Sequence, residues 1–85
     1  MFPMHVGIYS LQQILYQGDA ESINCMTASG EITALANHRP LISILKQGIV
    51  TVVDKANQKH YIRISSGFLE VRRNNQARII VTEQE

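Results

Sequence analysis

The sequence lacks most of the features that secreted, membrane-spanning and redox-active proteins need. It has one cysteine, Cys25, so no disulfide can form within the chain, which fits a reducing compartment. No apolar run approaches the ~20 residues that a helix needs to cross a bilayer. Residues 1–5 also lack the charged head and apolar stretch of a signal peptide. We therefore expect a cytoplasmic protein, or one held peripherally on a membrane complex without inserting into the membrane.

Concentrated charge is also missing. Eight Lys and Arg are balanced by seven Asp and Glu, and no basic run along the sequence exceeds the pair Arg72-Arg73. Phosphate-driven binding of nucleic acid needs a concentrated basic footprint. The sequence therefore predicts no nucleic-acid partner.

Patterns for catalysis and for metal or phosphate binding are equally sparse. The candidate metal ligands His5, Cys25, His38 and His60 stand in neither a C-x-x-C nor an H-x-x-x-H spacing. The five glycines are isolated, whereas a phosphate-binding loop is rich in glycine and usually opens a helix. Cys25 alternates with polar neighbours and is interpreted as a small buried apolar residue. We predict a protein without catalytic residues, metal or cofactor, and not an enzyme.

β-branched residues, in contrast, are abundant. Eleven Ile, six Val and four Thr make up about a quarter of the 85 residues, and such side chains fit a pleated strand better than a helix. The one short helix candidate, 41–47, lies between Pro40 and Gly48 and could equally be extended. This length suffices for one domain, and we expect a single β-sandwich domain over residues 1–85.

Alternating apolar and polar residues, separated by turn residues, divide the chain into strands. Turns are predicted at 18–19, 28–30, 37–40, 54–59, 65–67 and 72–76. Between them we expect strands at 4–8, 14–17, 20–27, 31–35, 49–53, 60–64, 68–71 and 77–81. About eight to nine short strands at this spacing predict an all-β protein, a small β-sandwich of two sheets.

Two segments, 41–45 and 49–53, carry apolar residues on both faces. A sheet with one solvated face alternates more cleanly than this. A second sheet, a partner protein, or both must therefore cover part of these segments.

Several motifs, in order along the chain, resemble the F-type ATP synthase ε subunit family. Gly30-Glu31 followed by Asn-His-Arg-Pro-Leu at 37–41 resembles the family's Gly-Glu and, after a short apolar run, Gly-His-Ala-Pro-Leu. Residues 45–48 and 65–71 resemble its Leu-Lys-Pro-Gly and Ser-Gly-Gly-Phe-Leu-Glu-Val, and 16–18, 21–23 and 79–81 fit further family segments. The resemblance covers nearly the whole chain and is to the N-terminal β-sandwich domain. Members typically continue into a C-terminal helical hairpin, which these residues do not include.

The resemblance implies a non-catalytic central-stalk subunit of the rotor in an ion-translocating F-type ATP synthase. In this family the sandwich grips the γ subunit and rests on the c-ring, at the cytoplasmic side of the energy-coupling membrane, and helps couple ion flow to ATP synthesis. Carried over by motif, the c-ring contact falls on Ala28, Ser29, Gly30 and Glu31. The γ-subunit contact falls on Ser10, His38, Leu41 and Ser43.

Departures from the family pattern leave alternatives open. Asn37 stands where the family has Gly, and we expect the turn to survive because Asn tolerates the left-handed backbone region. Arg39 replaces a small Ala and adds a charge beside His38.

One alternative function is that of a free-standing β-sandwich adaptor for an unrelated protein partner. Another is a small enzyme or nucleic-acid binder, which a pocket lined by His38, Arg39 and a carboxylate would favour.

Overall fold

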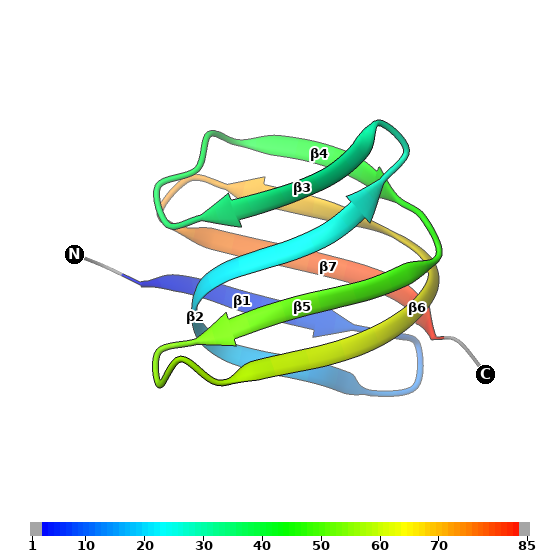
Figure 1. The fold of residues 1–85 in the computed structure, drawn as a ribbon, viewed down its shortest axis with the longest axis horizontal. Coiled ribbons are helices and arrows are strands. Elements are labelled where there is room, and N and C mark those ends of the chain that lie inside the picture. Colours follow the sequence, from blue (N-terminus) through cyan, green and yellow to red (C-terminus); the bar gives the residue numbers. More distant parts are fainter. Residues whose placement is uncertain (1–2, 84–85) are drawn as a thin grey trace.

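The computed structural model describes residues 3–83, which form strands and turns without a helix (Figure 1). No segment of the described chain is therefore a helix able to cross a membrane. Its seven strands are β1 (Met4–Tyr9), β2 (Ile14–Thr27), β3 (Gly30–Leu35), β4 (Leu41–Leu45), β5 (Gly48–Asp54), β6 (Lys59–Arg72) and β7 (Gln76–Glu83). Residues 41–45 of the ambiguous segment 41–47 thus form a strand, and the all-β prediction is confirmed.

Two long strands, β2 and β6, bend and pass from one layer of the sandwich to the other (Figure 1). The first part of β2 pairs with β1, and its second part pairs with β3 and β5. β6 pairs with β5 as far as Ile64, and then with β4 and β7. One layer therefore contains β1, β7, the end of β6 and β4. The other contains β3, the end of β2, β5 and the start of β6, which confirms the predicted sandwich.

The structure has seven strands rather than eight or nine because two predicted turns are wrong. Residues 18–19 lie inside β2, and residues 65–67 lie inside β6. The pairing register shifts close to both places, between Ala20 and Ser22 against β5 and between Ile64 and Ser66 against β7. Bulges of this kind bend a strand and let it change sheets without ending it.

Gly67 shows why a turn-like residue occurs within β6. A Cβ atom added there would clash with the backbone carbonyl oxygen of Ile80 and lie 3.1 Å from Cα of Val81. Only glycine therefore lets β6 and β7 approach this closely, and its role here is close packing rather than reversal of the chain.

The other four predicted turns form close to their predicted positions, whereas the loop at 10–13 between β1 and β2 was not predicted. Residues 28–29, 36–37, 55–57 and 73–75 form the reversals between neighbouring strands. Asn37 has φ 67°, Asn57 64°, Asn74 67° and Asn75 56°. These are left-handed conformations that Asn tolerates better than most residues, so the expectation for Asn37 is confirmed.

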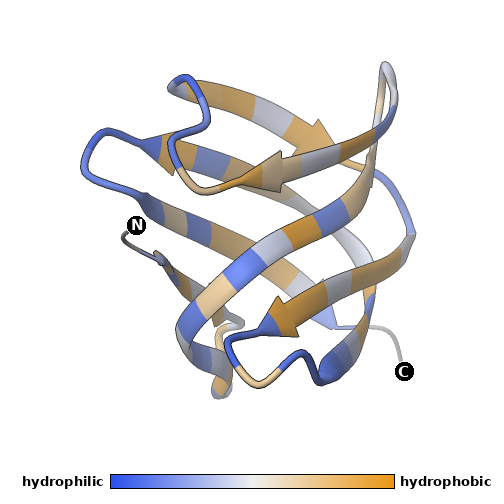
Figure 2. Cartoon of the chain, turned by 60° about the vertical axis from the view of Figure 1, so that its left-hand side comes forward, coloured by the Kyte–Doolittle hydropathy of each residue, from blue (hydrophilic) through white to orange (hydrophobic). Residues whose placement is uncertain are grey.

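The core lies between the two layers and follows the predicted alternation, which is visible as bands of alternating hydropathy along the strands (Figure 2). Met4, Val6 and Ile8 of β1 are each no more than 1% exposed. In β2, Ile23 and Cys25 point inward while Ser22 and Asn24 lie on the other face. A second sheet thus covers part of the apolar surface of β4 and β5, as predicted, but not all of it.

Candidate functional site

The β2–β3 turn brings the four residues of the predicted c-ring contact together at one end of the sandwich (Figure 1). Thr27, which is buried, organises this turn. Its Oγ1 donates a hydrogen bond to the carbonyl of Gly30 (2.7 Å) and accepts one from the N–H of Ser29 (3.1 Å). Gly30 has φ 124°, a value that strongly favours glycine. The turn is therefore well braced.

Solvent reaches this braced turn from outside. Ala28, Ser29 and Glu31 are exposed, and Gly30 is half-buried. The N–H of Ala28 donates to the carbonyl of Ile44 (3.1 Å), which anchors the turn on β4. The hydrogen-bonded turn thus exposes one carboxylate, that of Glu31.

Three of the four predicted γ-contact residues lie together on the β3–β4 loop and on β4. The N–H of His38 donates to the carbonyl of Leu35 (3.1 Å), and its Nδ1 lies 2.7 Å from the carbonyl oxygen of Arg39. Leu41 and Ser43 lie on the same, half-buried face of β4. β4 is paired along its length only with β6, apart from one contact with β2, so much of its other edge is unpaired within the described chain.

Ser10, the fourth, lies apart from these three. It follows β1, which ends at the opposite end of the sandwich from the β3–β4 loop (Figure 1). Its Oγ donates to Oε2 of Glu83 (2.7 Å), and its N–H donates to the carbonyl of Gln13 (2.9 Å). Ser10 therefore pins the β1–β2 loop to the end of β7.

The sequence predicts that a second sheet, a partner or both cover part of 41–45, but not that an apolar surface extends over the outer face of β4, β6 and β7. Ile42 is 74% exposed, Ile44 69% and Phe68 44%. Ile44 stands opposite Phe68, and Phe68 stands opposite Ile80, so their side chains adjoin across three strands. We call Ile42, Ile44, Phe68 and Ile80 the outer apolar row. The sequence shows apolar residues on both faces of 41–45, and alternation alone does not say which face points outward.

One pair of titratable side chains lies at the β5–β6 hairpin. Asp54 Oδ2 lies 2.8 Å from Nε2 of His60, and Oδ1 accepts hydrogen bonds from the N–H groups of Ala56 (2.8 Å) and Gln58 (2.9 Å). The bond from His60, together with those from the backbone, lowers the pKa of Asp54. These contacts close the hairpin loop and so serve a structural purpose.

Neither Cys25 nor the candidate metal ligands form a reactive site within the described residues. Cys25 is 1% exposed, and burial raises the pKa of its thiol to about 11. It is protonated at neutral pH and packs as an apolar residue, as predicted. Within residues 3–83, no three His, Cys, Asp or Glu side chains form a group that could hold a metal ion.

Comparison with known proteins identifies relatives of this fold. The family described as "ATP synthase, Delta/Epsilon chain, beta-sandwich domain" matches residues 3–85. The ATP synthase epsilon chain of Protochlamydia amoebophila (strain UWE25) is 32% identical over 75 residues, which are 88% of this chain and 50% of that protein. The chain thus spans about half the length of the curated relative that it matches.

Two solved structures share the fold. A chain of the Euglena gracilis mitochondrial ATP synthase, OSCP/F1/c-ring in rotational state 1, superimposes with a TM-score of 0.89 at 24% identity, covering 95% of this chain and 51% of that one. A chain of the Tetrahymena thermophila mitochondrial ATP synthase central stalk/c-ring gives 0.79 at 15% identity, covering 96% and 65%.

Proposed function

The chain belongs to the ATP synthase delta/epsilon β-sandwich family, and on that premise we propose that it is a non-catalytic rotor component of an ion-translocating F-type ATP synthase. It would join the γ subunit to the c-ring and help couple ion flow to ATP synthesis. The match of the family to residues 3–85 carries this proposal. The two structural neighbours, whose names refer to F1/c-ring and to central stalk/c-ring, are consistent with it.

A joint that transmits torque needs a body that does not shear. Here β2 and β6, each 14 residues long, run through both layers of the sandwich. Sliding one layer over the other would distort both strands and disrupt a close-packed core. The fold thus supplies the stiffness that the proposed role requires.

We place the c-ring contact on Ala28, Ser29, Gly30 and Glu31. Two observations support it: the turn is exposed, and Thr27 braces it from inside. An exposed carboxylate on a rigid turn can pair with a basic group on a polar loop, and the backbone of the turn is already ordered before binding.

We place the γ contact on His38, Leu41 and Ser43, extended by the outer apolar row. The unpaired edge of β4 and the exposed side chains of Ile42 and Ile44 support this placement, because adjoining exposed apolar residues mark interaction sites. Ser10 lies at the far end of a body 37 Å long. One partner could contact all four predicted residues only by lying along the sandwich. The complex would sit peripherally at the cytoplasmic face of the energy-coupling membrane.

The alternative of a free-standing adaptor uses the same apolar row with a different partner. The pocket of His38, Arg39 and a carboxylate that would favour a small enzyme is not found, since the groove lined by His38 and Arg39 has no carboxylate among its described lining residues.

Assembly with rotor subunits tests the proposal. The chain is mixed with γ subunit and detergent-solubilised c-ring from the same source and separated by size exclusion. A ternary complex is expected, with little retention on the c-ring when γ is omitted. Elution apart from both partners, with each partner folded, would reject the rotor assignment and favour the adaptor.

A further inference from the structure

A basic groove opens at the end of the sandwich that carries the β3–β4 loop and the β6–β7 turn. It is an open groove of about 810 Å³, and Arg39, Arg72 and Arg73 are among its lining residues. The imidazole of His38 and two asparagines from the β6–β7 turn line it as well, and none of the described lining residues is acidic. The sequence did not reveal this cluster, because Arg39 stands far along the chain from Arg72 and Arg73.

The fold holds the two arginine-bearing loops together. Leu41, just after the β3–β4 loop, stands opposite Val71, just before the β6–β7 turn. The N–H of Asn37 donates to Oδ1 of Asn75 (2.6 Å), which ties one loop to the other. The carbonyl oxygen of Asn75 in turn accepts a hydrogen bond from the N–H of His5 (2.7 Å). The groove is therefore a built feature rather than a chance approach of two loose loops.

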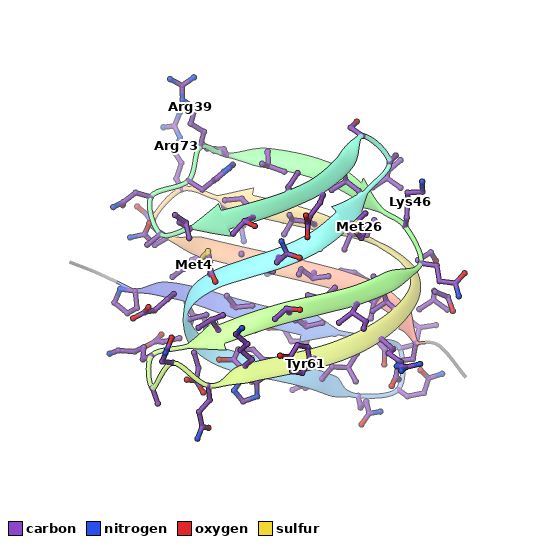
Figure 3. All side chains as sticks on the ribbon, viewed as in Figure 1. Met4, Met26, Arg39, Lys46, Tyr61 and Arg73 are labelled. Atoms are coloured by element: carbon purple, nitrogen blue, oxygen red, sulfur yellow. The ribbon has the colours of Figure 1, made fainter. Side chains whose placement is uncertain are left out.

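The positive charge of the groove is poorly balanced from within. Arg72 has a carboxylate nearby, with Nε 4.0 Å from Oε2 of Glu70. Arg39 and Arg73 form no ion pair with any residue in 3–83, and both project from the same end of the sandwich (Figure 3). An anion bound between the two loops would offset these positive charges.

We propose that this groove binds a small oligophosphate anion, with the guanidinium groups of Arg39 and Arg73 gripping its oxygens and Arg72 completing the charge balance. A planar guanidinium matches phosphate geometry and donates two parallel hydrogen bonds. The volume of the groove lies within the range of small-molecule sites. Three arginines also match the several charges of linked phosphates.

Two other classes of anion fit less well. Nucleic acid needs a basic stripe that follows its backbone, whereas this cluster is confined to one end of the molecule. An acidic peptide would need apolar anchors beside the charges, and among the described lining residues the only apolar side chains are those of two prolines. The inference stands independently of the rotor assignment, since it concerns the free chain.

The test is a titration of the isotope-labelled chain with inorganic tripolyphosphate, followed by amide chemical shifts at low ionic strength. Saturable shifts confined to 37–39 and 72–75 are expected at millimolar ligand or below. A parallel titration with ATP distinguishes the sources of the phosphates. Equal affinity identifies an inorganic oligophosphate, and tighter binding of ATP identifies a nucleotide.

Matched variants separate a site from general attraction to positive charge. Arg39→Gln with Arg73→Gln removes two charges from the groove. The control, Lys46→Gln with Arg63→Gln, removes two charges elsewhere; Lys46 lies at the opposite end (Figure 3). All four side chains are exposed, so both doubles should keep a native amide spectrum. We expect the groove double to bind about tenfold more weakly or worse, as loss of two charge-assisted bonds implies, and the control to bind nearly as the parent does.

Three results would overturn the proposal. The first is an absence of saturable shifts with either phosphate ligand. The second is an equal loss of affinity in the two double variants. The third is tighter binding of an oligoglutamate peptide or a single-stranded oligonucleotide than of tripolyphosphate.

Discussion

Replacing Gly67 with alanine tests the layer-crossing geometry of β6. The new Cβ would clash with the backbone carbonyl oxygen of Ile80 and meet Val81 at 3.1 Å. Backbone atoms in a paired strand cannot move aside as a flexible side chain can, so β6 and β7 must separate locally. Overpacking of this kind typically costs about 1–3 kcal/mol. For a domain of this size, a loss of about 2 kcal/mol lowers the melting temperature by roughly 8–16 °C.

Gly48→Ala is the matched control, since it makes the same change at another strand glycine. Its Cβ would meet only the side chain of Met26, at 3.5 Å, which is ordinary van der Waals contact. We expect it to be neutral or to stabilise by about 0.4–1 kcal/mol, because alanine restricts the unfolded chain. Urea and thermal melts of the three proteins provide the comparison. Equal stabilities of Gly67→Ala and the parent, or equal losses in both variants, would refute the close approach of β6 and β7.

Three further predictions concern the surface and the β5–β6 hairpin. Glu31→Lys should change the free energy of unfolding by no more than about 0.5 kcal/mol. It should weaken retention of the γ-bound chain on the c-ring, and unchanged retention would argue against this contact. Ile44→Asp should weaken γ binding by about tenfold or more, because the Ile44 side chain, 69% exposed in the free chain, would lose burial at the interface worth about 1–2 kcal/mol. The control Tyr61→Asp, at a side chain 65% exposed on the other layer, should not weaken binding. Equal effects of the two substitutions would count against the outer apolar row as the γ contact. The pKa of Asp54 in the folded chain lies below its ordinary 3.8, so the stabilising effect of its carboxylate is present above that pH and disappears as the pH falls through the lowered value. In urea melts, Asp54→Asn should therefore lose less stability on acidification than the parent does. An equal loss in the two proteins would argue against a stabilising His60 contact.

Local patterns in the sequence predict the individual strands well, but not where strands continue. Alternation places Met4, Val6 and Ile8 on one face because side chains of a strand alternate strictly between its two sides. Residues 18–19 and 65–67 were misjudged because glycine and serine are typical both of turns and of bulges. Only the pairing partners, which are distant in the sequence, determine which of the two forms.

The candidate surfaces also differ in how far the sequence predicts them. The proximity of residues 28–31 was predictable because they are contiguous and form one turn, whereas their assignment to the c-ring rests on the family resemblance. The outward direction of Ile42 and Ile44 was not predictable, since alternation separates two faces without saying which one meets the core. The basic groove was missed because Arg39 joins Arg72 and Arg73 only through the pairing of β4 with β6.

Calorimetric titration of the chain with purified γ subunit from the same source tests the rotor assignment most directly. We expect a one-to-one complex that co-elutes on size exclusion and is weakened by Ile44→Asp but not by Tyr61→Asp. An absence of binding heat and of co-elution, with γ demonstrably folded, would contradict the assignment and leave this sandwich as an adaptor for some other protein.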